Sequence, residues 1–366
     1  MIDLIPLGGA NSIGSSCYLL KIDEVNVLID CGLKIAQFLV FDNPIQNLLK
    51  EIGHLTNLHG VFVTHAHLDH MGALPILVAN GYNGMFYGTS ITKELTYISL
   101  CDFYKKYYYQ QDSKTFEIQK HNIDYIRAFW EPVDYYHKRQ IYNFQVTPLI
   151  SGHLIGGCSF LIEAGSKQIL FSGDVSLNPL SQMSYPLIED CDYFICDGTG
   201  LKIEGKIQDL SEAEELLVLL NSSKPVLINN YVLGKDIFYL LKIKEIIERY
   251  GLHKQIIVTT YTQRLLSIYE KQYPIRFNDI KFSDRFSNES DTIWIGNYNV
   301  DPERVNIIDR LIHYHNHLNQ SQLLFLIKEI LKPSKTFFVH TNSTNVPTIF
   351  ENCYLIYENL HYALEG

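Results

Sequence analysis

Four side chains able to bind a metal ion are packed into six consecutive residues. They are His65, His67, Asp69 and His70, in the sequence Thr-His-Ala-His-Leu-Asp-His. Imidazole nitrogens and carboxylate oxygens suit zinc and related divalent ions. Because a catalytic metal keeps one position open for water, four donors in one segment exceed what one metal needs from it. The spacing predicts two metal ions that share a nucleophile, in preference to a polar loop of histidines that only form hydrogen bonds.

Three further side chains of the same kinds follow predicted strands elsewhere in the chain. His153 lies in a glycine-rich loop, Asp174 follows the apolar segment 168–172, and His340 follows the segment 335–339. Glycine lets the backbone approach a cation closely, and strand ends are where α/β folds place functional groups. By themselves, His153 and Asp174 would be turn residues more often than ligands. Combined with the first four, they give five histidines and two carboxylates, as expected of a two-metal hydrolase with one bridging carboxylate.

The elements that must position these side chains are strands and one helix. The β-branched segment 61–64 predicts a short strand that leads into His65, and the segment 72–80 predicts a helix beside the cluster. The positive end of that helix would lie near bound anions. Asp30 follows the predicted strand 25–29. It is expected either to orient a ligand histidine or to form a turn.

Strands and helices alternate from residue 192 onward. The apolar segments 225–230 and 255–259 predict buried strands on either side of a long helix that Gly251 ends. This alternation predicts a parallel α/β lobe. The segment 277–302 is polar and is predicted to be an irregular loop or lobe boundary.

Composition limits the function classes. The chain has 366 residues, 46% of them hydrophobic, and a formal net charge of −10 from 30 basic and 40 acidic side chains. This length suffices for two lobes. The negative charge excludes a global attraction to nucleic acid, so a polyanion would have to be held by local basic side chains and by metal. The seven cysteines include no Cys-x-x-Cys pair and are expected to be reduced. No signal peptide or membrane-spanning segment is expected, and the predicted location is the cytoplasm.

The motifs around these residues resemble those of the β-CASP nuclease family of metallo-β-lactamase-fold hydrolases, which includes RNase J and the endonuclease that cleaves pre-mRNA 3′ ends. The resemblance covers about the first 200 residues and about the last 55. The His-x-His-x-Asp-His motif is specific for the superfamily, and the N-terminal Leu-Gly-Gly-Ala-Asn motif points to this branch. The matching segments are Pro6–Asn11, Cys17, Asp30–Gly32, Thr64–His70, Gly72–Pro75, Gly152–His153 and Ser172–Asp174.

This resemblance implies an α/β fold, specifically an αββα metallo-β-lactamase sandwich with an inserted parallel α/β lobe. Residues 1–200 would form the first part of the metallo-β-lactamase domain. Residues 201–310 would form the inserted β-CASP-like domain, and residues 311–366 would complete the first domain. The inserted lobe is short for the family.

The resemblance also implies roles for the metal-binding side chains. One divalent ion would be held by His65, His67 and His153, and a second by Asp69, His70 and His340, with Asp174 bridging the two ions. Zinc is the expected metal, and manganese is the alternative. Asp69 would also orient the attacking water or accept its proton.

Two further residues match catalytic positions of the family. Asp197 matches an acidic residue that follows a strand, and His317 matches a histidine that is usually followed by Thr-Asp. His317 would protonate the departing 3′-oxygen while Asp197 fixes the imidazole tautomer. His315 is the rival of His317 for this role. Asn319 stands where the family has aspartate.

The substrate-binding positions depart further from the family. Its members carry a phosphate-facing Gly-Arg in the inserted lobe, where this chain has Gly234-Lys235. Lysine keeps the charge but loses the bidentate geometry of arginine. Lys235 and Ser151 are the residues expected to bind substrate.

The expected function is that of a two-metal phosphodiesterase, a ribonuclease of RNA processing or decay, in which a metal-bridging hydroxide attacks phosphorus. RNA is preferred because the relatives act mostly on RNA; DNA is the second polymer, and a homodimer is possible. The short lobe motivates an alternative, a hydrolase of a small ester, thioester or cyclic phosphodiester. A scaffold without activity is disfavoured because all seven ligands are present.

Overall fold

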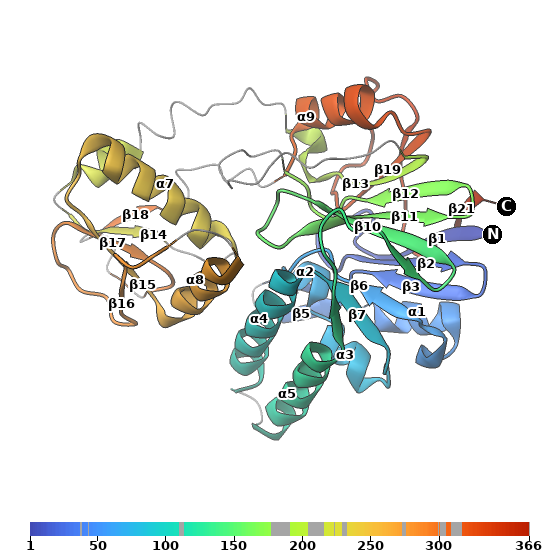
Figure 1. The fold of residues 1–366 in the computed structure, drawn as a ribbon, viewed down its shortest axis with the longest axis horizontal. Coiled ribbons are helices and arrows are strands. Elements are labelled where there is room, and N and C mark those ends of the chain that lie inside the picture. The colour runs from blue at the N-terminus through green and yellow to red at the C-terminus, as the bar shows by residue number, and fades with distance from the viewer. Residues whose placement is uncertain are drawn as a thin grey trace. The chain divides into compact units, whose positions relative to one another are not determined.

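The structure of the protein is a computed structural model, in which two compact units are distinguished (Figure 1). The first comprises Met1–Asn178, Met183–Glu204 and Asn316–Gly366, and the second comprises Pro179–Gln182 and Gly205–His315. The second unit therefore lies between segments of the first in the sequence. The residues described are 1–36, 39–42, 44–109, 113–176, 191–203, 216–222, 224–228, 233–272, 276–298, 300, 305–308 and 317–365.

The first unit contains two seven-stranded sheets. The first sheet is antiparallel from β21 to β3 and parallel from β3 to β8. Its strands are, in spatial order, β21 (Tyr362–Glu365), β1 (Ile2–Gly8), β2 (Cys17–Ile22), β3 (Val25–Ile29), β6 (Gly60–Phe62), β7 (Met85–Gly88) and β8 (Trp130–Pro132).

The second sheet has the same mixed character. It is antiparallel from β9 to β12 and parallel from β12 to β20. Its strands are, in spatial order, β20 (Cys353–Leu355), β19 (Lys335–Val339), β13 (Tyr193–Asp197), β12 (Lys167–Phe171), β11 (Cys158–Ala164), β10 (Phe144–Ile150) and β9 (Arg139–Ile141). The short strands β4 (Lys34–Ala36) and β5 (Leu39–Asp42) pair separately.

Helices cover the outer face of each sheet. Against the first sheet pack α1 (Ile45–Ile52), α2 (Leu68–Met71), α3 (Leu74–Ala79), α4 (Ser90–Tyr109) and α5 (Ser113–Ala128), with the short 3₁₀ helix η1 (Leu55–Asn57). Against the second sheet packs α9 (Gln320–Phe325), which continues as the π-helix η4 (Leu326–Leu331). The unit is thus an αββα sandwich, which confirms the fold class expected from the sequence. No helix among the described residues has the length and apolar character needed to cross a bilayer.

The first sheet has a hydrophobic core on each face, because successive side chains of its strands point to opposite faces. In β2, Cys17 and Leu19 face the helices, whereas Tyr18 and Leu20 face the second sheet. Strands with both faces buried consist almost wholly of apolar residues. This requirement explains the apolar runs in the sequence, and it fixes the register of the strands.

The second unit is a parallel α/β lobe, as expected. Every strand pair in its five-stranded sheet is parallel. The strands are, in spatial order, β16 (Lys281–Phe282), β15 (Gln255–Val258), β17 (Thr292–Ile295), β14 (Val226–Ile228) and β18 (Asn306–Ile308), and its helices include α7 (Lys235–Tyr250) and α8 (Thr260–Gln272). Gly251 ends α7 in the left-handed conformation, with φ 61°.

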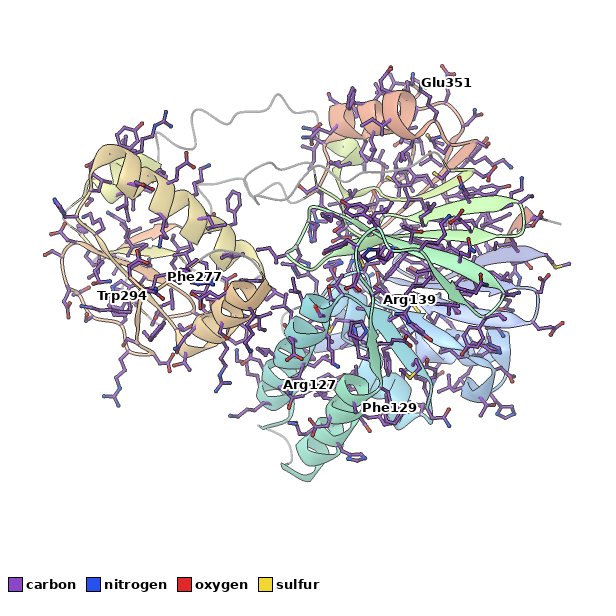
Figure 2. All side chains as sticks on the ribbon, in the orientation of Figure 1. Arg127, Phe129, Arg139, Phe277, Trp294 and Glu351 are labelled. Carbon is purple, nitrogen blue, oxygen red and sulfur yellow. The ribbon has the colours of Figure 1, made fainter. Side chains whose placement is uncertain are left out.

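The expectation of an irregular segment at 277–302 was wrong. This segment contains β16 and the central strand β17, in which all four residues are buried. Trp294 of β17 lies in the core of the second unit (Figure 2), and its indole N–H donates to Thr292 Oγ1 over 2.9 Å. A strand of four residues buried on both faces shows no polar alternation, so the polar residues around it dominated the sequence pattern.

Phe62→Ala should destabilise the first unit. Phe62 is completely buried between the two sheets and stacks on Tyr87 with ring centroids 4.9 Å apart. The substitution should lower the free energy of unfolding by about 3–5 kcal/mol. Urea denaturation followed by Trp130 fluorescence, in a Trp294→Phe background, measures this unit. Phe325→Ala, at a side chain that is 54% exposed, is the control and should cost less than about 0.5 kcal/mol. Equal effects would contradict the packing described.

Asp236→Asn should change how the second unit responds to pH. Burial raises the pKa of Asp236 from 3.8 to about 6, although backbone N–H groups of the first turn of α7 partly oppose this. The unfolded chain releases this proton at lower pH than the folded chain, so stability falls as pH rises between these values. Above pH 6 the free energy of unfolding of the second unit should be lower by about 3 kcal/mol than at acidic pH. Trp294 fluorescence in a Trp130→Phe background measures it, and the Asn variant should lose this pH dependence. Glu245→Gln, exposed on α7, should retain it.

Candidate metal and active site

The histidine-rich loop is held against the end of β3 by backbone hydrogen bonds. The N–H of Ser16 donates to Asp69 O over 2.8 Å, and the N–H of Cys31 donates to His70 O over 2.7 Å. Between them, Gly32 has no side chain because a Cβ there would lie 1.7 Å from Asp69 O. This close approach places Asp69 and His70, both in the single turn of α2, at the edge where the strands end.

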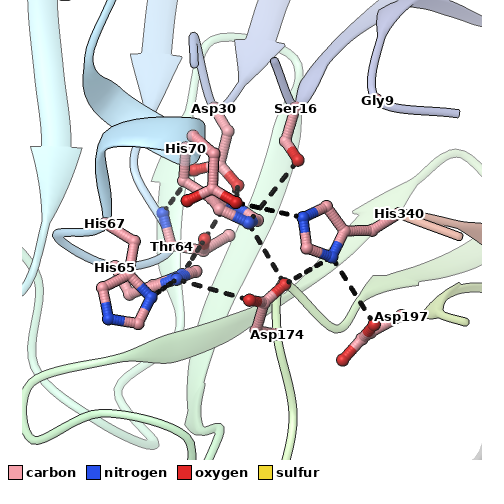
Figure 3. A network of polar contacts seen from close by, with 12 residues as sticks. Gly9, Ser16, Asp30, Thr64, His65, His67, His70, Asp174, Asp197 and His340 are labelled. Carbon is pink, nitrogen blue, oxygen red and sulfur yellow. Dashed lines mark hydrogen bonds and ion pairs between the residues drawn. The ribbon is translucent and has the colours of Figure 1, made fainter. Parts of the chain in front are cut away.

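One group of donors surrounds a point between the two sheets. His65 Nε2 lies 3.0 Å from His67 Nδ1, and His153 Nε2 lies 3.1 Å from the same atom. Asp174 Oδ2 lies 3.7 Å from His65 Nε2 and 3.4 Å from His153 Nε2. Gly173, the residue before Asp174, has φ 56°, and a Cβ there would lie 2.8 Å from Thr64 Cβ. Three imidazoles and one carboxylate therefore face one another, as Figure 3 shows in part.

A second group uses the other oxygen of Asp174. Asp174 Oδ1 lies 3.1 Å from His70 Nε2 and 3.5 Å from His340 Nδ1. His340 Nε2 lies 3.2 Å from Asp69 Oδ2. His340 follows β19 and has the left-handed φ of 52°, and its N–H donates to Gly9 O over 2.7 Å. The structure therefore brings together all seven side chains named as metal ligands from the sequence.

The donor set fits divalent metal ions. Four donor atoms around one tetrahedral ion would be roughly 3.3 Å apart, given bonds of about 2.0–2.1 Å, and the observed contacts are close to this spacing. Asp174 is only 3% exposed, yet its Oδ1 accepts no hydrogen bond among the described residues. Such a buried carboxylate oxygen requires a partner. A cation shared by the surrounding imidazoles satisfies this requirement.

A buried network orients the imidazole of His70. The backbone N–H and the hydroxyl of Thr64 donate to the two oxygens of Asp30, each over 2.8 Å. His70 Nδ1 lies 2.7 Å from Asp30 Oδ2, so Asp30 accepts its proton and directs Nε2 toward Asp174 (Figure 3). Of the two alternatives for Asp30, the orientation of a histidine is the one observed. Burial raises the pKa of Asp30, and His70 and Thr64 oppose that rise.

Asp197 and His317 form a pair beside the seven donors. His317 Nδ1 lies 2.6 Å from Asp197 Oδ2, and His317 Nε2 lies 3.8 Å from Asp174 Oδ2. The side chain of His317 is 23% exposed, and that of Asp69 is 31% exposed, whereas Asp197 is buried. Solvent therefore reaches Asp69 and His317, while Asp197 supports the imidazole from behind.

Burial and neighbouring charges shift the pKa values of the histidines in the cluster. Burial lowers the pKa of His65 well below its ordinary value, and the neighbouring His70 adds to this effect. Burial opposes the charging of His340, but Asp174, Asp197 and Asp69 outweigh it and raise its pKa to about 10. The carboxylates of this site thus favour positive charge in their midst, a condition that a bound cation also meets.

The described residues do not test the roles expected of Ser151, Lys235 and His315. Ser151 is buried, and its hydroxyl has no hydrogen bond among the described residues, so its expected contact with substrate stays a prediction. Lys235 is the first residue of α7, but its side chain lies outside the described residues. His315 also lies outside them, and the comparison with His317 stays open. Asn319 is the N-cap of α9, where its side chain accepts from Gln322 N.

Sequence reasoning did not identify Thr199. This residue opens the 3₁₀ helix η3 (Thr199–Lys202), and its hydroxyl lies 3.1 Å from His340 Nδ1. The only available signal was its position two residues after Asp197, in Asp-Gly-Thr at the end of a predicted strand. That signal indicates a turn as readily as a functional contact.

Comparisons with known proteins agree with this architecture. Residues 19–178 match the metallo-beta-lactamase superfamily domain. The chain is similar over its whole length to the crystal structure of a protein of unknown function from Enterococcus faecalis, with a TM-score of 0.66 and 13% identity, covering 99% of this chain and 100% of the other. That similarity concerns the fold alone.

Relatives with similar sequences carry more specific names. The chain is 28% identical to the probable RNase MJ4 of Methanocaldococcus jannaschii, over 60% of this chain and 51% of that protein. It is 29% identical to Integrator complex subunit 11 of Danio rerio, over 54% of this chain and 34% of that protein. It is 33% identical to the transcription termination factor FttA of Methanosarcina mazei, over 46% of this chain and 26% of that protein. The matched region therefore spans about half of these relatives' lengths or less.

The resemblance expected from the sequence motifs is confirmed by these matches. The domain match includes the histidine-rich loop, His153 and Asp174, and the sheets that carry them have the expected αββα arrangement. Residues 19–178 therefore match a metallo-beta-lactamase superfamily domain, and the names of the relatives agree with the resemblance of the motifs to the β-CASP nuclease family.

Proposed function

We propose that this protein is a two-metal phosphodiesterase that hydrolyses nucleic acid, with RNA as its substrate. The observation that supports this most directly is the buried Asp174 carboxylate, whose two oxygens face two different groups of donors. A carboxylate so placed can bridge two ions. Bridged ions fit the in-line displacement of a phosphodiester, which needs both the attacking and the departing oxygen stabilised.

The residues proposed to hold the two ions are the seven donors. His65, His67 and His153 would hold the first ion, and Asp69, His70 and His340 the second, with Asp174 shared between them. Two divalent ions held there would lower the pKa of water to near neutrality and neutralise phosphate oxygens. Zinc is the metal that we propose, because imidazole donors dominate both groups. Manganese is the alternative that metal analysis would reveal.

Asp69 and His317 are proposed to move protons. Burial opposes the ionisation of Asp69, but the hydrogen bond from His340 and the charge of His70 outweigh it and lower its pKa. Asp69 is thereby kept as a carboxylate that can orient the attacking water. Burial also opposes charging of His317, yet Asp197 and Asp174 raise its pKa to about 8, so it holds a proton for the departing oxygen. Both side chains are reached by solvent.

RNA is proposed because two kinds of relative point to it. One is named a probable RNase, and another, from Schizosaccharomyces pombe, is named endoribonuclease ysh1, at 26% identity over 48% of this chain and 23% of that protein. DNA remains the alternative polymer. A homodimer and a cytoplasmic location stay predictions from the sequence.

Asp174→Ala should abolish both metal binding and cleavage. The wild-type protein should contain about two zinc ions per chain, and the variant fewer than one, because each ion loses a ligand. Metal content is measured by mass spectrometry, and cleavage with end-labelled single-stranded RNA and DNA of the same sequence. Asp134→Ala, at an exposed position, is the control. Two metals without cleavage of either polymer would favour a small-ester or cyclic-phosphodiester hydrolase, and a wild-type protein without metal would favour a scaffold.

His317→Ala should slow cleavage without removing metal. Loss of a positioned general acid typically costs a factor of about 10²–10⁴ in rate. The metal content should stay at the wild-type level because His317 is not among the seven donors. Single-turnover cleavage of the labelled RNA measures the rate. His361→Ala, at an exposed histidine that pairs with Glu51, should cleave normally. A His317→Ala protein with the wild-type rate would overturn the role of general acid.

A further inference from the structure

We propose that Thr199 and Thr64 are positioning residues that decide which ring nitrogen of His340 and of His65 faces the metal. Neither threonine would touch metal or substrate. The inference rests on the proposed two-metal function and adds to it a choice between two arrangements of the second ion.

His340 could join either of two donor groups. Its Nε2 lies 3.2 Å from Asp69 Oδ2, in the group that also contains His70. Its Nδ1 lies 3.7 Å from Asp197 Oδ1, in a group that contains Asp174 and His317 as well. These distances do not choose between the groups. The choice depends on which nitrogen carries the proton, because a protonated nitrogen cannot bind metal.

The hydroxyl of Thr199 settles the position of that proton. It donates to the backbone carbonyl of His340 over 3.0 Å and lies 3.1 Å from His340 Nδ1. A hydroxyl has one proton, and a carbonyl oxygen only accepts. Since the proton of Thr199 is used on the carbonyl, its contact with the ring must be a donation from Nδ1–H. Nε2 then carries the free lone pair, on the side of Asp69.

Asp197 does not accept the proton of His340 Nδ1, because both of its oxygens have other partners. Its Oδ2 faces His317 Nδ1 over 2.6 Å, and its Oδ1 accepts from the backbone N–H of Thr199 over 2.9 Å. Asp197 Oδ1 is 3.7 Å and Asp174 Oδ1 is 3.5 Å from His340 Nδ1, both farther than the hydroxyl of Thr199 at 3.1 Å. The hydroxyl of Thr199 is therefore the acceptor closest to this N–H, and the second ion belongs to the group of Asp69, His70 and His340.

Thr64 repeats this arrangement at the first group. Its hydroxyl donates to Asp30 Oδ2 over 2.8 Å and lies 3.0 Å from His65 Nδ1. Because a carboxylate oxygen accepts, His65 Nδ1–H must donate to the hydroxyl. His65 Nε2 is then free to face His67 and Asp174. Each of the two metal positions thus has one threonine that fixes the tautomer of one ligand.

Thr199→Val is the direct test, because valine has the same shape and keeps the backbone N–H that donates to Asp197. Zinc affinity is measured by titration against a chromophoric chelator, with the fold checked by circular dichroism. The variant should bind one of its two zinc ions about 10–100-fold more weakly, the usual effect of losing the partner of a ligand histidine. Thr199→Ser should restore the affinity, since it restores the hydroxyl.

Thr341→Val is the matched control. Thr341 is buried next to His340 in the sequence, but its hydroxyl accepts from the backbone N–H of Ser343 over 3.1 Å. This variant should bind both ions normally. A Thr199→Val protein that binds both zinc ions with wild-type affinity would overturn the inference alone. A wild-type protein that fails to bind two ions would instead overturn the proposed function.

A second measurement uses the unmutated protein and stands even if Thr199→Val does not fold. Histidine labelled with ¹⁵N in the zinc-loaded protein reports by NMR which ring nitrogen carries a proton, and His340→Gln identifies the signal. A proton on Nδ1 of His340 supports the role of Thr199. A proton on Nε2, with metal on Nδ1, would overturn it.

Discussion

The buried charge of Asp174 is the constraint around which the first unit is built. A carboxylate that is 3% exposed is stable only when positive charge or hydrogen-bond donors surround it. His65 and His153 face one oxygen, and His70 and His340 face the other. Because Asp174 and these histidines come from four separate segments, the ends of β6, β10, β12 and β19 must meet. The layered sandwich holds those ends together without exposing its apolar strands.

The side chains of the site differ in solvent exposure in a way that suits the proposed chemistry. The groups that would hold cations are mostly buried, whereas Asp69 and His317 are partly exposed. Behind them, Asp30, Thr64, Asp197 and Thr199 direct the imidazoles through short hydrogen bonds. Imidazole orientation therefore depends on residues outside the seven proposed metal donors, and their contribution is one of geometry.

Much of the site was predictable because its donor residues lie in short sequence motifs or directly after apolar segments. The cluster at 65–70 has the ligands in one short motif, and His153, Asp174 and His340 each follow an apolar strand. Thr199 was not predictable, since its role depends on the carbonyl of a residue 141 positions away. The strand β17 was missed because burial on both faces leaves no alternation. The family resemblance correctly indicated the sandwich and the inserted lobe, which periodicity alone did not distinguish from other α/β arrangements.

The position of His340 in the chain has a consequence for synthesis. The first donor group is complete once residue 174 has been made, but the second requires a histidine 271 residues after Asp69, beyond the whole inserted lobe. Its strand β19 must also enter the sheet beside β13. During synthesis, all donors of the first group have therefore been made at a stage when the second group still lacks His340. An enzyme assembled in this order stays inactive until its last strands have folded.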